Sequence, residues 1–214
     1  MGRTSDARER LIESAIALFW RHGFAGVSVD QLCESAGVKK GSFYHFFASK
    51  EELALAALEA HWERRKPILD ELFSPSRAPL ERLAAYFRFI HTRQCEIQGT
   101  YGQVLGCFYF SLGTSNVDQP RLNQRVREII GFYERYHQSA LVEAEQQGLV
   151  KLRDPAEKAR DLFRYIEGLL ADARLHGTTD RLADMPRLGF EFIGLEAPEP
   201  PDAAKLPTVA TARP

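Results

Sequence analysis

Apolar residues recur at helical spacing along almost the whole chain. The first such stripe is Leu11, Ile12, Ala15, Ile16 and Phe19, which share one face of a helix with 3.6 residues per turn. The sequence contains no internal repeat and no stretch in which apolar and polar residues alternate as in a half-buried strand. The pattern therefore predicts an all-α protein.

Capping signals divide this helical pattern into about nine helices. Ser28 with Gln31, and Ser49 with Glu52, have the spacing of capping boxes, and glycines follow several apolar stripes as they do at helix ends. Pro67 should kink or end the helix that contains it. The predicted helices cover residues 11–22, 28–36, 39–46, 50–73, 79–90, a short stretch within 99–113, and residues 122–147, 155–176 and 181–194.

Charge and composition exclude several classes of protein. The 214 residues carry a formal net charge of −1, so only a local patch could bind nucleic acid. Three cysteines without a CxxC pair argue against a disulfide scaffold and for a reducing compartment. No apolar run is long enough to span a membrane, and the N-terminus lacks a signal-peptide pattern. We expect a cytoplasmic protein without membrane contact, with a disordered Pro- and Ala-rich tail over residues 196–214.

Residues 28–47 have the pattern of a helix-turn-helix. A tight turn at residues 35–38, which contains Gly37, joins two short helices. The second helix places Phe43, Phe46 and Phe47 on its apolar face. A helix of barely two turns is marginal by itself, so it must pack against the helices that precede it.

The opposite face of this second helix suits DNA. Lysines at the start of a reading helix can meet phosphates or guanine edges. Glycine lets the backbone approach closely, and hydroxyl and imidazole groups can bond to phosphates or bases. The candidate DNA contacts are Lys39, Lys40, Gly41, Ser42, Tyr44, His45 and Lys50. The alternative is that the lysines are only solvated surface charges.

The stretch from Ser28 to Leu53, with the core Gly-Ser-Phe-Tyr-His-Phe-Phe followed by Ser-Lys-Glu, resembles the DNA-binding domain of TetR-like transcriptional regulators. The resemblance covers residues 8–55. It implies a homodimer with a three-helix DNA-binding domain, here residues 1–49, and a larger ligand-binding and dimerisation domain, here residues 50–195. It adds Ser28 to the operator contacts named above. Cys33 departs from the pattern, because a small residue such as alanine is common there.

The same resemblance implies an effector pocket lined by the middle helices. The candidate residues are His61, Trp62, Phe87, Ile90, His91, Tyr101, Cys107, Phe108, Tyr133 and His137. The alternative is that these side chains form ordinary core. No histidine pair has HxxxH or HExxH spacing, so we expect no metal and no cofactor.

Cys107 lies in Gly106-Cys107-Phe108, at the expected start of the short sixth helix. This segment resembles a TetR-like branch in which the corresponding thiol of some members responds to electrophiles or oxidants. A helix N-terminus favours the thiolate. The alternative is that Cys107 is a small buried core residue.

The last two helices are expected to form the dimer interface, with ordinary burial inside one chain as the alternative. The candidate interface residues are Leu162, Phe163, Ile166, Leu169, Leu170, Ala173, Leu188 and Phe192.

The overall prediction is a dimeric repressor that binds a pseudo-palindromic operator on double-stranded DNA and is released by a small-molecule effector. Two alternatives are a small enzyme, although no GxGxxG, GxSxG or Walker motif is present, and a helical protein–protein interaction module.

Overall fold

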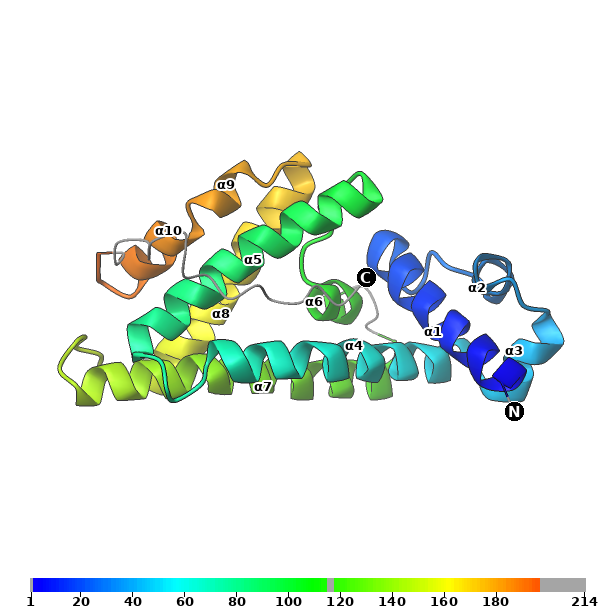
Figure 1. Ribbon diagram of the computed structural model, residues 1–214, viewed down its shortest axis with the longest axis horizontal. Helices are drawn as coiled ribbons and strands as arrows, with labels where there is room; N and C mark the ends of the chain where they lie inside the picture. Colours follow the sequence, from blue (N-terminus) through cyan, green and yellow to red (C-terminus); the bar gives the residue numbers. More distant parts are fainter. Residues whose placement is uncertain (1, 115–117, 197–214) are drawn as a thin grey trace. The chain divides into compact units, whose positions relative to one another are not determined.

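The computed structural model describes residues 2–114 and 118–196, so most of the tail predicted over residues 196–214 lies outside the described residues. Every regular element in the described part of the chain is helical, as predicted (Figure 1). No described helix is long and apolar enough to cross a membrane. The helices are α1 (Gly2–His22), α2 (Val29–Ala36), α3 (Lys40–Phe46), α4 (Lys50–Leu72), α5 (Pro79–Tyr101), α6 (Phe108–Thr114), α7 (Pro120–Gln146), α8 (Pro155–His176), α9 (Asp180–Ala183) and α10 (Met185–Phe192).

The structure differs from the prediction at several helix bounds: α1 begins at Gly2 rather than at residue 11, and α5 continues to Tyr101 rather than to residue 90. The last predicted helix is split at Asp184 into α9 and α10. Pro186 then stands in the first turn of α10, where its missing N–H leaves no helical bond unmade. Pro67 lies inside α4 and does not end it, and α4 runs to Leu72, close to the predicted end at residue 73. Both Pro67 and Glu63, whose carbonyl loses its helical partner because proline has no N–H, are exposed residues.

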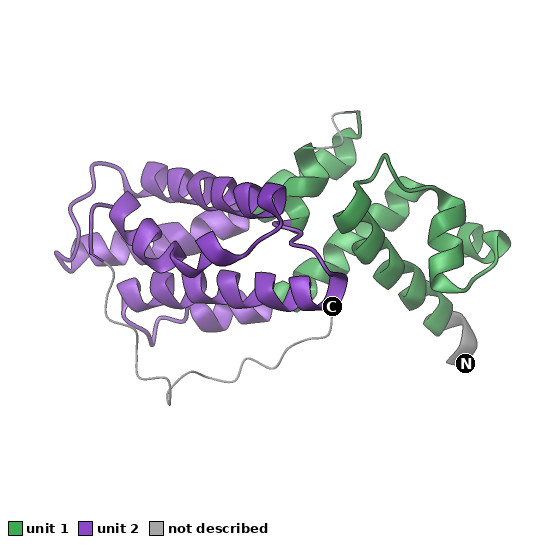
Figure 2. Ribbon diagram, turned by 90° about the horizontal axis from the view of Figure 1, so that it is seen from above, with its two compact units in different colours: residues 1–65, 108–130 green, residues 66–107, 131–214 purple. Residues whose placement is uncertain are grey.

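The chain forms two compact units, drawn in different colours in Figure 2. The first unit comprises residues 1–65 and 108–130, and the second comprises residues 66–107 and 131–214. The division passes through α4 and α7, and it places α6 in the first unit. The predicted domain boundary after residue 49 therefore falls inside the first unit.

The first unit begins with a small core shared by α1, α2 and α3. Leu11 and Ala15 from α1, Leu32 from α2 and Phe43 from α3 are completely buried. The turn that separates α2 from α3 depends on Gly37, whose left-handed φ of 61° lets its N–H bond back to the carbonyls at the end of α2. These contacts hold the short α3 in place.

The rest of the first unit adds α6 and the first parts of α4 and α7. The ring of Phe108 in α6 lies 5.6 Å from Trp20 of α1 and 4.8 Å from His61 of α4. Nδ1 of His61 lies 2.7 Å from the hydroxyl oxygen of Tyr109. The guanidinium of Arg125 in α7 pairs with Glu59 in α4. The first unit is thus assembled from two distant parts of the sequence.

The second unit packs α5, α8, α9 and α10 with the remaining parts of α4 and α7. Asp154 caps α8 by accepting bonds of 2.9 Å from the N–H groups of Ala156 and Glu157. Phe87 of α5 lies against α10 at Gly189, where an added Cβ would come within 2.6 Å of the Phe87 ring. The close approach of α5 and α10 therefore requires glycine at this position.

Candidate nucleic-acid interface

The short helix α3 presents one apolar and one polar face. Phe43 is completely buried, whereas Tyr44 is 54% exposed. Lys39, Lys40, Gly41 and His45 are also exposed, and Ser42 is partly buried. The structure therefore brings the candidate residues of α3 onto one accessible surface, which is supported from beneath by the ring of Phe43.

Two features leave the start of α3 open. No atom outside the immediate chain lies within 4 Å of a Cβ built on Gly41, so packing inside the protein does not require glycine there. Nζ of Lys40 lies 2.8 Å from Oδ1 of Asp30, and the hydrogen bond to this carboxylate raises the pKa of Lys40. Both partners are largely exposed, and such surface pairs are weak. A phosphate could therefore compete for the ammonium of Lys40.

Ser28 has a structural function at the start of α2. Its hydroxyl oxygen accepts the N–H of Gln31 at 3.2 Å, and the side chain of Gln31 accepts the N–H of Ser28 at 2.8 Å. This confirms the capping box that the sequence predicted. Ser28 is exposed, and its own O–H group can still donate a hydrogen bond outward.

The side chain of Lys50 is less exposed to solvent than the sequence suggested. Its Nζ donates bonds of 2.8 Å to the carbonyls of Phe24 and Val27, and it lies 4.2 Å from the centroid of the Phe24 ring. Partial burial lowers the pKa of Lys50. Lys50 thus joins the start of α4 to the loop between α1 and α2, and one of its three ammonium protons remains for another acceptor.

The candidate effector residues are divided between the two units. His61, Trp62 and Phe108 belong to the first unit, in the cluster around Tyr109. The others belong to the second unit, but they are spread over several helices. Phe87 and Ile90 are buried on α5, His91 contacts Cys95, Tyr101 is partly exposed at the end of α5, Cys107 precedes α6, and Tyr133 and His137 are buried on α7.

Cys107 lies directly before α6, close to where the sequence placed it, and it is partly buried. It forms a hydrogen bond with Glu167 of α8. Burial raises the pKa of Glu167 to about 8, and the bond to Cys107 offsets this only in part. The preceding Gly106 is held by Gln94, whose side chain accepts its N–H at 3.1 Å and donates to its carbonyl at 3.0 Å.

Sequence reasoning missed Glu167 and Gln94. The available signal was a polar residue inside an apolar helical stripe.

Most of the predicted dimer residues lie inside their own chain. Five of them are at most 5% exposed, namely Leu162, Phe163, Ile166, Leu170 and Ala173. They pack into the core of the second unit, as the alternative of burial inside one chain predicts. Leu169, Leu188 and Phe192 are partly exposed. The most exposed large apolar residue of α8 is Leu175, at 82%.

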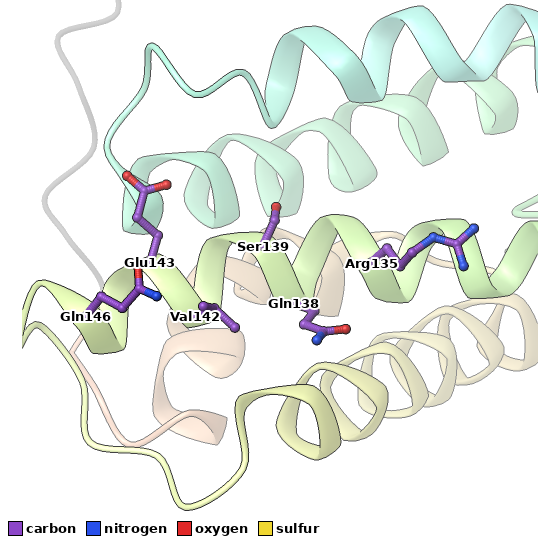
Figure 3. Close-up of a pocket in the computed structure, with 6 residues that line it drawn as sticks. All are labelled: Arg135, Gln138, Ser139, Val142, Glu143 and Gln146. Atoms are coloured by element: carbon purple, nitrogen blue, oxygen red, sulfur yellow. The ribbon is translucent and has the colours of Figure 1, made fainter.

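A surface pocket lies along α7 in the second unit (Figure 3). Its lining consists of Arg135, Gln138, Ser139, Val142, Glu143 and Gln146. All of these residues come from the second unit. None of them was among the candidates from the sequence, and the pocket has no part in the surface formed by α3.

Comparison with known proteins identifies the family. The model of "Bacterial regulatory proteins, tetR family" matches residues 11–57, which include α2, α3 and the start of α4. Transcriptional regulator AcuR from Cereibacter sphaeroides is 30% identical over 193 residues, which cover 87% of this chain and 85% of AcuR. HTH-type transcriptional repressor NemR from Escherichia coli K12 is 32% identical over 114 residues, or 53% of this chain and 55% of NemR. The chain thus matches about half of the length of NemR.

The solved structures agree with the sequence comparison. Regulatory protein TetR from Rhodobacter sphaeroides matches with a TM-score of 0.75 at 28% identity, covering 86% of this chain and 96% of that one. The relatives are transcriptional regulators rather than enzymes. The chain belongs to the tetR family of bacterial regulatory proteins.

Proposed function

We propose that this protein is a repressor that binds a pseudo-palindromic DNA operator as a homodimer in the cytoplasm, and that a small molecule releases it. The observation that carries this proposal is the polar surface of α3, held in place by the buried ring of Phe43. A short helix with lysines at its start and polar groups along one face has the dimensions and chemistry to enter the major groove.

The residues of this surface divide into two groups by position. Lys39, Gly41 and Ser42 stand at the start of α3, the part of a reading helix that reaches base edges. Tyr44 and His45 lie farther along α3 and are suited to phosphates, which orient the protein without reading the sequence.

Substitutions within this surface test the proposal. We expect Lys39→Ala and Ser42→Ala to change the preference among operator variants, by about 1–3 kcal/mol at the affected base pair. Tyr44→Phe removes one hydroxyl donor, so it should weaken all operator variants about equally. Operators can be selected from random duplexes. Fluorescence anisotropy on singly substituted sites would then measure both effects. A uniform loss for all three variants would show that the division into two groups is incorrect.

Lys50→Met provides a structural contrast for these variants. It removes the two carbonyl bonds that join α4 to the loop after α1, so the melting temperature should fall together with affinity for every operator. In the three α3 variants the melting temperature should remain that of the parent, because their side chains are exposed or only partly buried.

A symmetric operator requires two copies of α3, and therefore a dimer. The proposed contact surface is the outward face of α8. Gly168, Ala171 and Leu175 are exposed and share this face at helical spacing. Two small residues beside an exposed leucine allow a second helix to approach closely.

Leu175→Arg is expected to convert the dimer into a folded monomer, because it places an unpaired charge at the contact. Operator affinity should fall by about 100-fold or more once the two copies of α3 are no longer linked. Light scattering and circular dichroism would report mass and helicity. Ile166→Arg is the matched control, which should unfold the protein because Ile166 is only 1% exposed. A Leu175→Arg protein that remains dimeric would place the contact elsewhere.

The release step is proposed as a population shift between two states of the dimer, of which only one fits the operator spacing. Cys107 and the buried polar side chains of the second unit are the proposed places where an effector acts. Membership of this family argues against the alternative of a small enzyme, since the relatives are transcriptional regulators.

A further inference from the structure

His137 is a buried side chain without a hydrogen-bond partner among residues 2–114 and 118–196. It is 0% exposed, and neither Nδ1 nor Nε2 has a partner there. A neutral imidazole carries one donor and one acceptor, and native proteins rarely leave such buried groups unpaired. Burial keeps this ring neutral by lowering the pKa of His137 to about 3. The polar site at His137 is therefore incomplete within the described chain.

Aromatic rings from three elements surround the imidazole. The nearest ring centroid is that of Tyr86 on α5, at 4.9 Å. Phe73, directly after α4, lies at 5.7 Å, and Phe163 on α8 lies at 6.4 Å. All of these residues belong to the second unit. Such a lining favours a flat, largely apolar molecule.

Several ionisable side chains lie about one turn from these lining residues and are already paired. Glu167, one turn after Phe163 on α8, bonds to Cys107. Arg82, one turn before Tyr86 on α5, donates to Glu143 at 2.6 Å and to the carbonyl of Arg77 at 2.9 Å. The carboxylate of Asp70 accepts a bond of 2.6 Å from Lys66. An ionised molecule at His137 would lose its hydration without gaining a counter-charge, so the site favours a neutral one.

We propose that His137 anchors the effector and that the effector is a small neutral hydroxyaromatic molecule, in the simplest case a phenol. This inference rests on the proposed function, because it names the effector class of the same regulator. A hydroxyl group both donates and accepts, so it can complete either tautomer of the imidazole. The aromatic ring of the ligand would pack among the rings of Tyr86, Phe73 and Phe163.

Phe73 connects this site to α4. It is 5% exposed and follows the last residue of α4, and its ring also lies 5.3 Å from Tyr136. A ligand beside His137 needs space that aromatic rings now occupy, and displacing Phe73 would disturb the end of α4. The first residue of α4 is Lys50, which holds the loop between α1 and α2. Binding at His137 would thus act on a continuous helix that begins beside the DNA-binding residues.

Three probes of similar size test the ligand class on the full chain at pH 7.5. Phenol is expected to bind and to raise the melting temperature. Toluene has nearly the same shape but no hydroxyl, so it should bind about tenfold more weakly. Benzoate is charged and should not bind. Calorimetry would give the three affinities, and equal binding of phenol and toluene, or tighter binding of benzoate, would overturn the proposal.

Two substitutions test the unpaired nitrogen atoms without any ligand. His137→Leu and His137→Phe remove both atoms, so each should raise the melting temperature by about 2–4 °C. Each should also lose the preference for phenol over toluene. His91→Phe is the matched control, since Nε2 of His91 lies 3.4 Å from Sγ of Cys95, and it should give no rise. A lower melting temperature in both His137 variants would show that the imidazole has partners in the free protein and would overturn the proposal.

The two proposals fail in different ways. Operator binding by the parent chain without phenol tests the regulator function. Release of that operator by saturating phenol, with the other probes as controls, tests the effector class. A chain that binds phenol but no DNA would remove the proposed function, whereas a chain that binds DNA but prefers toluene or benzoate would remove only this inference.

Discussion

Phe43→Ala is expected to abolish operator binding and to destabilise the first unit by about 3–5 kcal/mol. The Phe43 side chain is 0% exposed and lies 6.1 Å, centroid to centroid, from the ring of Phe47. The helix that carries it has only 7 residues, so it depends on this packing rather than on its own stability. Without the ring, the exposed side chains of α3 would lose their common orientation.

Tryptophan fluorescence would follow this effect, because Trp20 and Trp62 are the only two tryptophans of the chain and both belong to the first unit. Urea unfolding should show a lower midpoint for Phe43→Ala. Phe46→Ala is the matched control, because Phe46 is only partly buried and should lose much less stability. A Phe43→Ala protein with the midpoint of the parent would contradict the packing described for α1, α2 and α3.

Glu167→Gln is expected to stabilise the second unit at alkaline pH. Burial raises the pKa of Glu167 from its ordinary value of 4.5 to about 8. Between these two values the unfolded chain releases the proton while the folded chain keeps it, so stability falls as the pH rises. One pKa unit corresponds to about 1.4 kcal/mol, and the loss above pH 8 is therefore on the order of a few kcal/mol. Glutamine cannot ionise and should remove this loss.

Urea unfolding followed by circular dichroism between pH 6.5 and 8.5 would measure the difference. This range avoids the titration of His137, whose pKa is lowered to about 3 in the folded protein. Below the ordinary value of 6.5 the unfolded chain binds a proton at this residue and the folded chain does not, so stability falls as the pH falls. Glu157→Gln, at an exposed position in the first turn of α8, is the control and should keep the slope of the parent. Equal slopes for Glu167→Gln and the parent would show that this carboxyl is hydrated in the folded protein.

Local chemistry explains what the sequence predicted well. The capping box at Ser28 and Gln31, the turn at Gly37 and the two faces of α3 all depend on residues a few positions apart. Such short-range rules place helix starts, helix ends and exposed faces without any knowledge of the fold. The polar surface of α3 could therefore be described before the structure was known.

Contacts between distant segments explain the rest. The carbonyl acceptors of Lys50 lie 23 and 26 positions earlier in the chain, so its ammonium was assigned to DNA alone. The apolar stripe of α8 was equally compatible with a partner chain and with its own core, and residues such as Ile166 lie in the core. A helical stripe shows that a face is buried but does not identify what buries it.

The assignment of α6 to the first unit has a practical consequence for protein engineering. Regulators with new specificity are made by fusing the DNA-binding head of one protein to the sensor of another. In this chain the DNA-binding head, residues 1–65, shares its compact unit with residues 108–130, which supply partners for Trp20, His61 and Glu59. A fusion that takes only residues 1–65 would expose these side chains and lose the pairing with Arg125. A working chimaera of this head needs both segments.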